Sequence, residues 1–283
     1  MERFLPVAIA FLVALPALAG EEPVLRVQKL IITGNRALDD EEVARAIGHV
    51  PDRTIVADKD VLEGLKKKLL AAYAERGYKE AKASLRLETA SLPGAAVLAI
   101  DVQEGEPERY SRIVVKGLPR GLSGALLASQ ADLKPGVVRD RAAVEESGRT
   151  LARKLAEQGY LDARVERFEE APAGPRRYVL TMPVRAGART TIIFRGNRHL
   201  RRGELLESLM GGGDFRTAPD SLDQGLARLR NLYRRAGFLH AEVTAQRLCR
   251  ADDGRTLAGR SACPSGWGEQ RLTFTVKEGP QVE

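Results

Sequence analysis

Gly77-Tyr78-Lys79-Glu80-Ala81 is the stretch that decides the fold, because its pattern occurs three times in the chain. The order of glycine, aromatic residue, two variable residues and alanine returns as Gly159-Tyr160-Leu161-Asp162-Ala163 and as Gly237-Phe238-Leu239-His240-Ala241. The first two glycines are 82 residues apart and the next two are 78 apart. Self-similarity at a nearly fixed period indicates a tandem array. We call this pattern the glycine–aromatic motif.

Each glycine–aromatic motif stands between two kinds of apolar pattern. Apolar residues lie four and eight positions before it, as at Tyr73 and Leu69, which places them on one face of a helix. Apolar and polar residues alternate after it, which predicts a strand. The glycine can end the helix in a left-handed conformation without a Cβ penalty. We therefore expect a structural role for Gly77, Tyr78, Gly159, Tyr160, Gly237 and Phe238.

A second landmark opens each repeat. An apolar triplet, at 30–32, 113–115 and 192–194, is followed by a glycine and reads as a buried strand. Two helical patterns precede the motif and two strand patterns follow it, and Pro183 in the last strand of the second repeat requires that pairing there has ended or bulged. The predicted fold is α+β, with three tandem β-α-α-β-β units that each pack two helices on one face of a three-stranded sheet. The predicted domains are 24–107, 108–187 and 188–280.

The first 19 residues have the three parts of a secretory signal peptide. Arg3 supplies a positive start, 5–18 is an apolar run, and Ala17-Leu18-Ala19 fits the small-residue cleavage pattern. The run is short for a transmembrane span. We expect cleavage after Ala19 and export of the chain, with an uncleaved anchor or a buried helix as the alternative.

The two cysteines, Cys249 and Cys263, stand fourteen residues apart around a loop-like segment. In an exported protein a disulfide can persist, and a loop of this size would be stabilised by about 3 kcal/mol in the chain-entropy model. A redox or metal pair is the alternative, but there is no C-x-x-C and the three histidines have no ligand spacing. We expect a Cys249–Cys263 disulfide and no metal.

The net charge of +7 arises in the second and third repeats, because residues 24–107 have a net charge of −1 and each of the other two segments has +5. Such a surface favours solubility, and it could also attract anionic lipid headgroups or acidic proteins; no nucleic acid is expected. The sequence has no catalytic triad pattern and no phosphate-binding loop, since Gly211-Gly212-Gly213 lacks the Lys-Ser/Thr sequel. We expect neither enzymatic activity nor a cofactor.

These features together resemble the POTRA domains of the outer-membrane assembly family that includes BamA and TamA. The resemblance rests on the export signal, the 80-residue units, the triplet with Gly-Asn at 34–35 and 196–197, the glycine–aromatic motif, and the closing phrase Glu-Gly-Pro at 278–280. It implies a periplasmic location at the outer membrane and binding of unfolded outer-membrane proteins or accessory assembly proteins.

No run of alternating ten-residue strands is present, so we expect the membrane barrel of such proteins to be missing from this chain, which would be the front part of a longer protein. The alternatives are the POTRA part of a two-partner secretion transporter and a barrel-less periplasmic scaffold.

The predicted binding mechanism is strand addition, because an open sheet edge offers unpaired backbone groups to an extended client. The strand after each motif is the candidate edge. Neighbouring units or the charged residues of these strands could instead block them. The predicted partner-binding residues are Ser84, Leu85, Arg86, Leu87, Arg164, Val165, Glu166, Arg167, Glu242, Val243, Thr244 and Ala245.

Overall fold

A computed structural model describes residues 24–48, 54–56, 58–90, 94–211, 215–259, 261–264 and 266–282. The predicted signal peptide, residues 1–19, lies outside the described residues, as do Gly212 and Gly213. The chain forms two compact units. Unit 1 comprises Met1–Ala74 and Glu80–Gly105, and unit 2 comprises Glu75–Lys79 and Glu106–Glu283.

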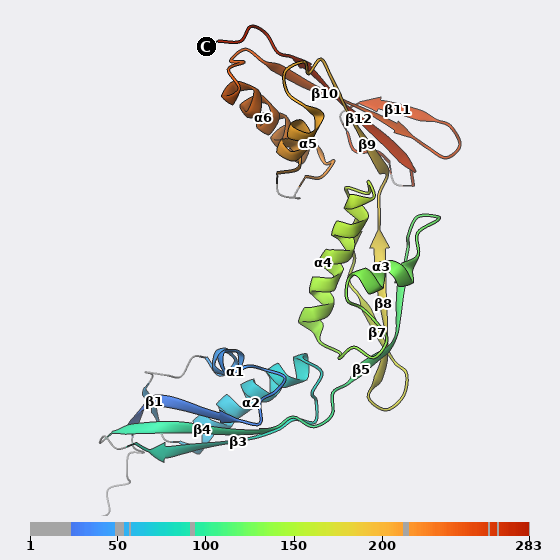
Figure 1. The fold of residues 1–283 in the computed structure, drawn as a ribbon. Coiled ribbons are helices and arrows are strands. Elements are labelled where there is room, and N and C mark those ends of the chain that lie inside the picture. The colour runs from blue at the N-terminus through green and yellow to red at the C-terminus, as the bar shows by residue number, and fades with distance from the viewer. Residues whose placement is uncertain are drawn as a thin grey trace, which may run out of the picture. The chain divides into compact units, whose positions relative to one another are not determined.

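Unit 1 holds most of the first repeat, a sheet with two helices on one side, whereas Glu75–Lys79 belong to unit 2 (Figure 1). Its sheet order is β2-β1-β4-β3, in which β1 runs parallel to β4 and the other pairs are antiparallel. Residues of β4 alternate between core and surface, and Leu69 and Tyr73 of α2 are buried in the core. The elements are β1 (Val24–Thr33), α1 (Asp40–Ala46), β2 (Thr54–Val56), α2 (Lys59–Glu75), β3 (Lys82–Thr89) and β4 (Ala95–Gln103).

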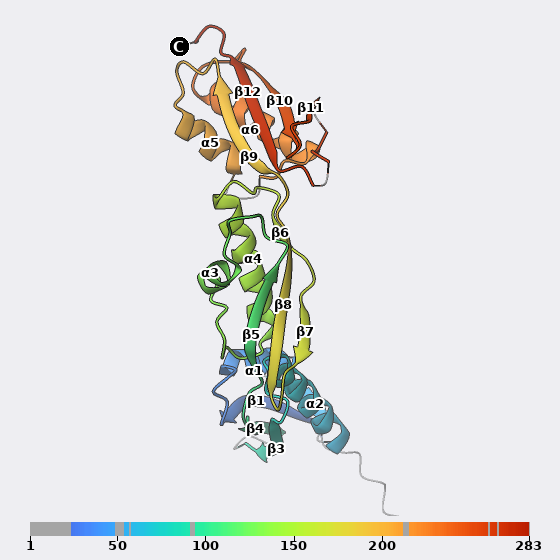
Figure 2. The same ribbon diagram turned by 90° about the vertical axis from the view of Figure 1, so that its right-hand side faces the viewer.

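Unit 2 holds the second and third repeats, which Figure 2 shows from the side. In the second repeat β8 is the central strand, parallel to β5 and antiparallel to both β6 and β7. Its hydrophobic core includes Leu151 and Leu155 of α4, which face the sheet as the helical pattern predicts. The elements are β5 (Arg109–Lys116), α3 (Gly124–Gln130), α4 (Arg141–Glu157), β6 (Arg164–Val165), β7 (Glu169–Pro172) and β8 (Arg177–Arg185).

The third repeat has the sheet order β11-β10-β12-β9, with β12 parallel to β9. Its core packs Leu229 and Tyr233 of α6 against Phe274 of β12. The motif aromatic Phe238 is 1% exposed and lies edge-on to Tyr233, so it packs back on the last turn of the helix. The elements are β9 (Arg189–Arg195), α5 (Arg202–Met210), α6 (Pro219–Arg235), β10 (Glu242–Arg250), β11 (Thr256–Gly259) and β12 (Glu269–Lys277).

The predicted α+β class and the β-α-α-β-β order are confirmed, but the number of strands in each sheet is wrong. The short strand β2 lies between the two helices of the first repeat and pairs with the start of β1. The strand β11 lies inside the segment between the cysteines, which was predicted to be a loop. Three or four residues are too few for period-2 alternation to identify such strands.

Pro183 splits the last antiparallel pairing of the second repeat, as the sequence predicted. Val165 pairs with Val184 and Glu169 with Thr181, so three residues of one strand face two of the other. The N–H of Glu166 donates to the carbonyl of Pro183 at 2.8 Å, but proline has no N–H to return the bond. The strand after the second motif therefore becomes two short strands, β6 and β7.

The glycine that follows each first strand packs directly on the last strand of its repeat. An added Cβ would lie 2.0 Å from the carbonyl oxygen of Val102 at Gly34, 2.3 Å from that of Val184 at Gly117 and 2.2 Å from that of Val276 at Gly196. Each glycine also has a φ near +80°. The residue is therefore fixed as glycine by contact and by backbone conformation.

We predict that Gly196→Ala lowers the free energy of unfolding of the third repeat by at least about 2 kcal/mol, from left-handed strain together with the contact to Val276. Gly203→Ala is the matched control, since no atom lies within 4 Å of its Cβ position and its φ is ordinary. The control should change stability by no more than about 1 kcal/mol. Denaturant unfolding followed by fluorescence of Trp267, the single tryptophan, measures both. Equal stability of the two variants would contradict the packing argument.

Candidate functional site

Strand β3 is the outermost strand of its sheet and pairs only with β4 among the described residues. The N–H of Ala90 donates to the carbonyl of Ala95, so this pair of the β3–β4 register is a hydrogen-bonded one. Hydrogen-bonded and non-hydrogen-bonded pairs alternate in an antiparallel ladder. The backbone groups of Ala83, Leu85 and Leu87 therefore point away from β4, toward the open edge.

The side chains of β3 divide between the two faces of the sheet. Ser84 and Arg86 are exposed on the face opposite the helices. Leu85 and Leu87 pair with the buried Ile100 and Leu98, lie on the core side and are half-buried. The open edge thus combines outward backbone groups with an apolar margin.

The predicted strand of the second repeat offers a much shorter edge. Arg164 and Val165 form all of β6, and Glu166 and Arg167 lie in the bulge, where Glu166 forms an ion pair with Arg185 at 2.9 Å. Strand β7 ends at Pro172. Its backbone nitrogen faces the open edge and, because the residue is proline, it offers no N–H there. A proline and a bulge are common guards of sheet edges. The expectation of one continuous strand after the second motif is corrected accordingly.

The predicted strand of the third repeat is an edge only in its first half. Strand β11 covers Arg247–Arg250 of β10, because the cysteine loop folds back as a hairpin. Glu242 and Thr244 point their backbones toward β12, so Val243 and Ala245 hold the outward groups. The outward carbonyl of Val243 accepts a hydrogen bond from Arg230 at 3.2 Å. Of the three predicted strands, β3 has the longest open edge.

The motif glycines have φ values of +86° at Gly77, +96° at Gly159 and +88° at Gly237. The carbonyl of each accepts a backbone hydrogen bond from a residue farther along the chain in unit 2. The donors are the N–H groups of Glu108 at 2.8 Å, Thr190 at 2.8 Å and Val282 at 2.9 Å, in the same order. The motif therefore ends a helix and also holds the segment that follows its repeat.

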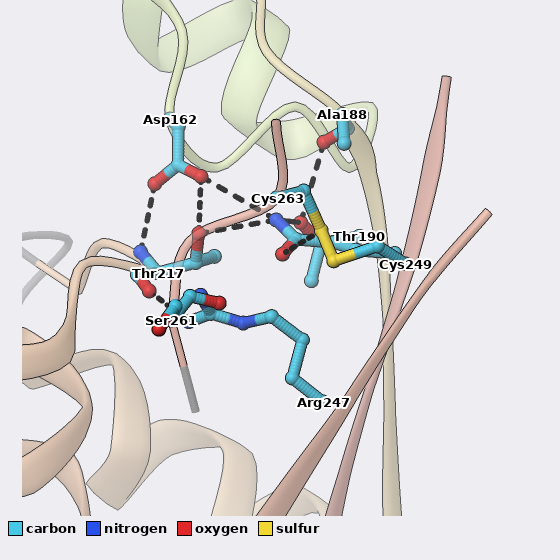
Figure 3. Close-up of a disulfide and its surroundings, with 9 residues drawn as sticks. Asp162, Ala188, Thr190, Thr217, Arg247, Cys249, Ser261 and Cys263 are labelled. Atoms are coloured by element: carbon cyan, nitrogen blue, oxygen red, sulfur yellow. Dashed lines mark hydrogen bonds between the residues drawn. A yellow bond between two sulfur atoms is a disulfide. The ribbon is translucent and has the colours of Figure 1, made fainter. Parts of the chain in front are cut away.

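A variable position of the second motif forms the joint between the second and third repeats (Figure 3). Asp162 accepts a hydrogen bond from the N–H of Thr217 at 2.7 Å through Oδ1, and from the Thr217 hydroxyl through Oδ2. Arg216 donates to the carbonyl of Leu161 at 2.7 Å. Two neighbouring residues before α6 are thus held by the motif of the preceding repeat.

Gln270 is 3% exposed and lies at the centre of this joint. Its Nε2 lies 2.8 Å from Oγ1 of Thr190, 3.1 Å from Oγ1 of Thr217 and 3.4 Å from Oδ2 of Asp162. Its Oε1 lies 3.5 Å from Sγ of Cys263. One amide therefore contacts both the disulfide and the polar groups that connect the repeats.

Arg247 is the largest fully buried side chain of the molecule's described part, with 2% of its surface exposed. Its guanidinium donates to the carbonyls of Ser261 and Thr217. Burial lowers the pKa of Arg247, and the negative charge of Asp162 opposes that effect. Sequence analysis missed Arg247, Thr217 and Gln270, because a single arginine on an alternating strand reads as a surface residue.

Cys249 and Cys263 are joined in the structure, with Cα atoms 5.7 Å apart. Cys249 is buried on the same side of β10 as Arg247, which precedes Cys249 by two residues. The bond attaches the loop that contains Ser261 to β10.

The closing phrases of the first and third repeats supply a carboxylate to the turn after the first strand. Glu104 accepts hydrogen bonds from the N–H groups of Arg36 and Ala37, both at 2.6 Å. Glu278 accepts from Arg198 at 2.8 Å and from His199 at 3.0 Å. The second repeat has Pro119 in its turn and Ala186 in its closing phrase, so the acceptor and one of the two donors are missing together.

The POTRA model, described as surface antigen variable number repeat, matches residues 25–105 and 108–187, which is more than half of the chain. The chain belongs to the POTRA family. The predicted resemblance is therefore confirmed. Residues 188–282 lie outside the two POTRA matches, and their sheet has the same parallel pairing of first and last strands.

Several solved structures are similar to this chain. POTRA domains 3–5 of BamA from Haemophilus influenzae are 19% identical, cover 90% of this chain and 97% of their own, and have a TM-score of 0.34. The N-terminal domain of Omp85 from Thermosynechococcus elongatus is 14% identical over 90% and 99%, with a TM-score of 0.32. CdiB from Escherichia coli is 20% identical over 61% of this chain and 29% of its own, with a TM-score of 0.30. No curated protein matches the chain.

The described residues contain no group of three or more His, Cys, Asp or Glu side chains that could hold a metal ion. They also contain no helix with the length and apolar character needed to cross a membrane.

The pKa of Glu278 bears on the acid stability of the third repeat. Burial raises the pKa of Glu278, but hydrogen bonds from the backbone and ring of His199 and from the N–H of Arg198 lower it by more, so this pKa lies below its ordinary value. A carboxyl whose pKa is lowered on folding stabilises the fold above its unfolded pKa. That stabilisation is lost as the pH falls through the folded pKa.

We predict that Glu278→Gln lowers the free energy of unfolding at pH 7 by about 1–3 kcal/mol, the effect of losing hydrogen bonds to a charged acceptor. Between pH 7 and pH 3.5 the variant should lose less stability than the unmodified chain. Glu269→Gln is the control, because Glu269 is exposed on β12. Denaturant unfolding followed by Trp267 fluorescence tests this, and identical pH profiles for the Glu278 variant and the unmodified chain would contradict it.

Proposed function

We propose that this chain is the periplasmic POTRA scaffold of an outer-membrane assembly or translocation protein. In this proposal it binds unfolded outer-membrane proteins by adding a client strand to β3, without catalysing a reaction. Family membership supports the scaffold role, and the geometry of β3 supports the binding mode.

The observation that carries the proposal is the outward direction of the backbone groups of Ala83, Leu85 and Leu87. Such groups can pair with any extended chain, because the bonds read backbone and not side-chain identity. A scaffold for many clients needs this tolerance. The edges of β6, β7 and β10 are interrupted, covered or capped, so β3 is the best suited of the predicted strands.

The side chains beside this edge favour a particular class of client. Leu85 and Leu87 are half-buried, so a strand added to β3 would cover their remaining apolar surface. Strands of outer-membrane proteins alternate apolar and polar residues, and an added strand of that kind would place its apolar side chains over the two leucines. Arg86 and Glu88 on the other face would meet the polar side chains.

We predict that Leu85→Pro reduces cross-linking of a porin-derived peptide to β3 by about tenfold. Proline removes an outward N–H and leaves the bonds to β4 in place, and edge strands tolerate proline at such positions. Leu85→Ala is the matched control, since it loses the side chain but keeps the N–H, and it should retain most of the cross-linking. The photoreactive group is placed at Ser84 on β3 and, for comparison, at Lys67, which is exposed on α2. Equal labelling from Ser84 and Lys67, or equal loss in the two Leu85 variants, would contradict strand addition.

An exported location also predicts the oxidation state of the cysteines. Chain purified from the periplasm without reductant should be two hydrogens lighter than the fully reduced chain, since a Cys249–Cys263 disulfide would have formed there. Intact mass spectrometry measures the difference. Two free thiols in chain isolated from that compartment would contradict the assignment.

A further inference from the structure

We propose that the Cys249–Cys263 disulfide controls the rigidity of the joint between the second and third repeats, so that the joint is a redox-sensitive element. The joint is the set of contacts that connects Asp162 to Thr217, Gln270 and Arg247. This inference does not depend on client binding at β3. It rests on a continuous series of contacts from the disulfide to the motif of the second repeat (Figure 3).

The first part of the series connects the disulfide to Arg247. Cys263 is two residues from Ser261, and Cys249 is two residues from Arg247 on β10. The disulfide therefore holds the loop so that the Ser261 carbonyl accepts a hydrogen bond from Nη1 of Arg247. Among the described residues, the disulfide is the covalent cross-link between this loop and β10, in addition to the β10–β11 backbone pairing.

The second part connects Arg247 to the second repeat. Nη2 of Arg247 donates to the carbonyl of Thr217, whose N–H and hydroxyl both donate to Asp162. Asp162 belongs to the glycine–aromatic motif of the second repeat, whereas Arg247 and Thr217 belong to the third. Gln270 supplies a parallel connection, because its amide contacts both Cys263 and Asp162.

Arg247 makes the series sensitive to a change at either end. It is a buried cation, it forms no ion pair with any described residue, and its Nε has no hydrogen-bond partner among them. Its charge is stabilised by the two carbonyls and by the negative charge of Asp162 nearby. Loss of the Ser261 carbonyl would leave a second buried donor unpaired, which favours movement of the guanidinium toward water and loss of the bond to Thr217.

The chemistry of release is thiol–disulfide exchange with a dithiol reductant. A thiolate of the reductant attacks Sγ of Cys263, the Cys249–Cys263 bond breaks, and Cys249 leaves as a thiolate that takes a proton from water. The second thiolate of the reductant then displaces Cys263, so the reductant ends as a disulfide and the protein has gained two electrons and two protons. Attack falls on Cys263 because Cys249 is 1% exposed, whereas Cys263 is half-buried in the loop.

Hydrogen exchange of the Thr217 amide, measured on the full chain by NMR, tests the proposal. Reduction by dithiothreitol should accelerate this exchange by about tenfold or more, the effect of weakening one hydrogen bond to a charged acceptor. The amide of Phe274, in the central strand β12, should keep its protection. A Cys249→Ala/Cys263→Ala chain should match the reduced one without any reductant.

The Asp162→Asn variant distinguishes a direct change in the joint from a change that reaches the joint through the loop. This variant weakens the acceptor of the Thr217 N–H directly, so its Thr217 amide should exchange rapidly when oxidised and should change little further on reduction. Unchanged Thr217 exchange in a chain whose reduction is verified by mass would overturn the proposal. Equal acceleration at Thr217 and Phe274 would also overturn it, because the disulfide would then stabilise the whole third repeat and not the joint.

The site of attack has its own measurement. Brief treatment with glutathione followed by acid quenching should give a mixed disulfide that peptide mass spectrometry locates at Cys263. Glutathione on Cys249 instead would overturn the assigned direction of exchange.

Discussion

The hydrogen bond accepted by the carbonyl of each motif glycine connects the end of one helix to the segment that follows the repeat. At Gly159 the left-handed backbone ends α4 and turns the carbonyl toward the N–H of Thr190, at the start of β9. A side chain at this position would strain the backbone because of its positive φ, whereas a Cβ there would only come within 3.4 Å of Arg189 and Thr190. The two variable residues after the aromatic are then free to differ, and in the second repeat one of them, Asp162, forms the joint. A structural motif thus carries a repeat-specific contact at its variable positions.

The three repeats share the same arrangement of helices and strands, and they differ in the turn after the first strand and in their sheet edges. The turn after the first strand needs either a carboxylate, as Glu104 and Glu278 supply, or a proline that removes a donor, as Pro119 does. The edges differ more: β3 is open, β6 and β7 are interrupted opposite Pro183, and β10 is half covered by β11. Only the first of these edges offers a long row of outward backbone groups, which places the proposed client site in the first repeat.

Sequence analysis predicted what depends on local periodicity and missed what depends on tertiary packing. The helices with Leu69 and Tyr73, or Leu229 and Tyr233, on one face were predictable because a buried stripe repeats in the sequence. The bulge opposite Pro183 was predictable because proline lacks a donor. Strand order, the covering of β10 by β11 and the burial of Arg247 were not predictable. An arginine on an alternating strand has the same sequence pattern whether its guanidinium donates hydrogen bonds to water or to buried carbonyls. The candidate edges could therefore be named from the sequence but not ranked.

The most direct test of strand addition is amide hydrogen exchange along β3 with and without an unfolded outer-membrane protein segment. A client strand would protect the outward amides of Leu85 and Leu87, which bond to no strand of the described chain, whereas the amides of Ser84 and Arg86 already bond to β4. The account predicts new protection at Leu85 and Leu87 and little change at Ser84 and Arg86. Client binding that leaves the two leucine amides unprotected would contradict it.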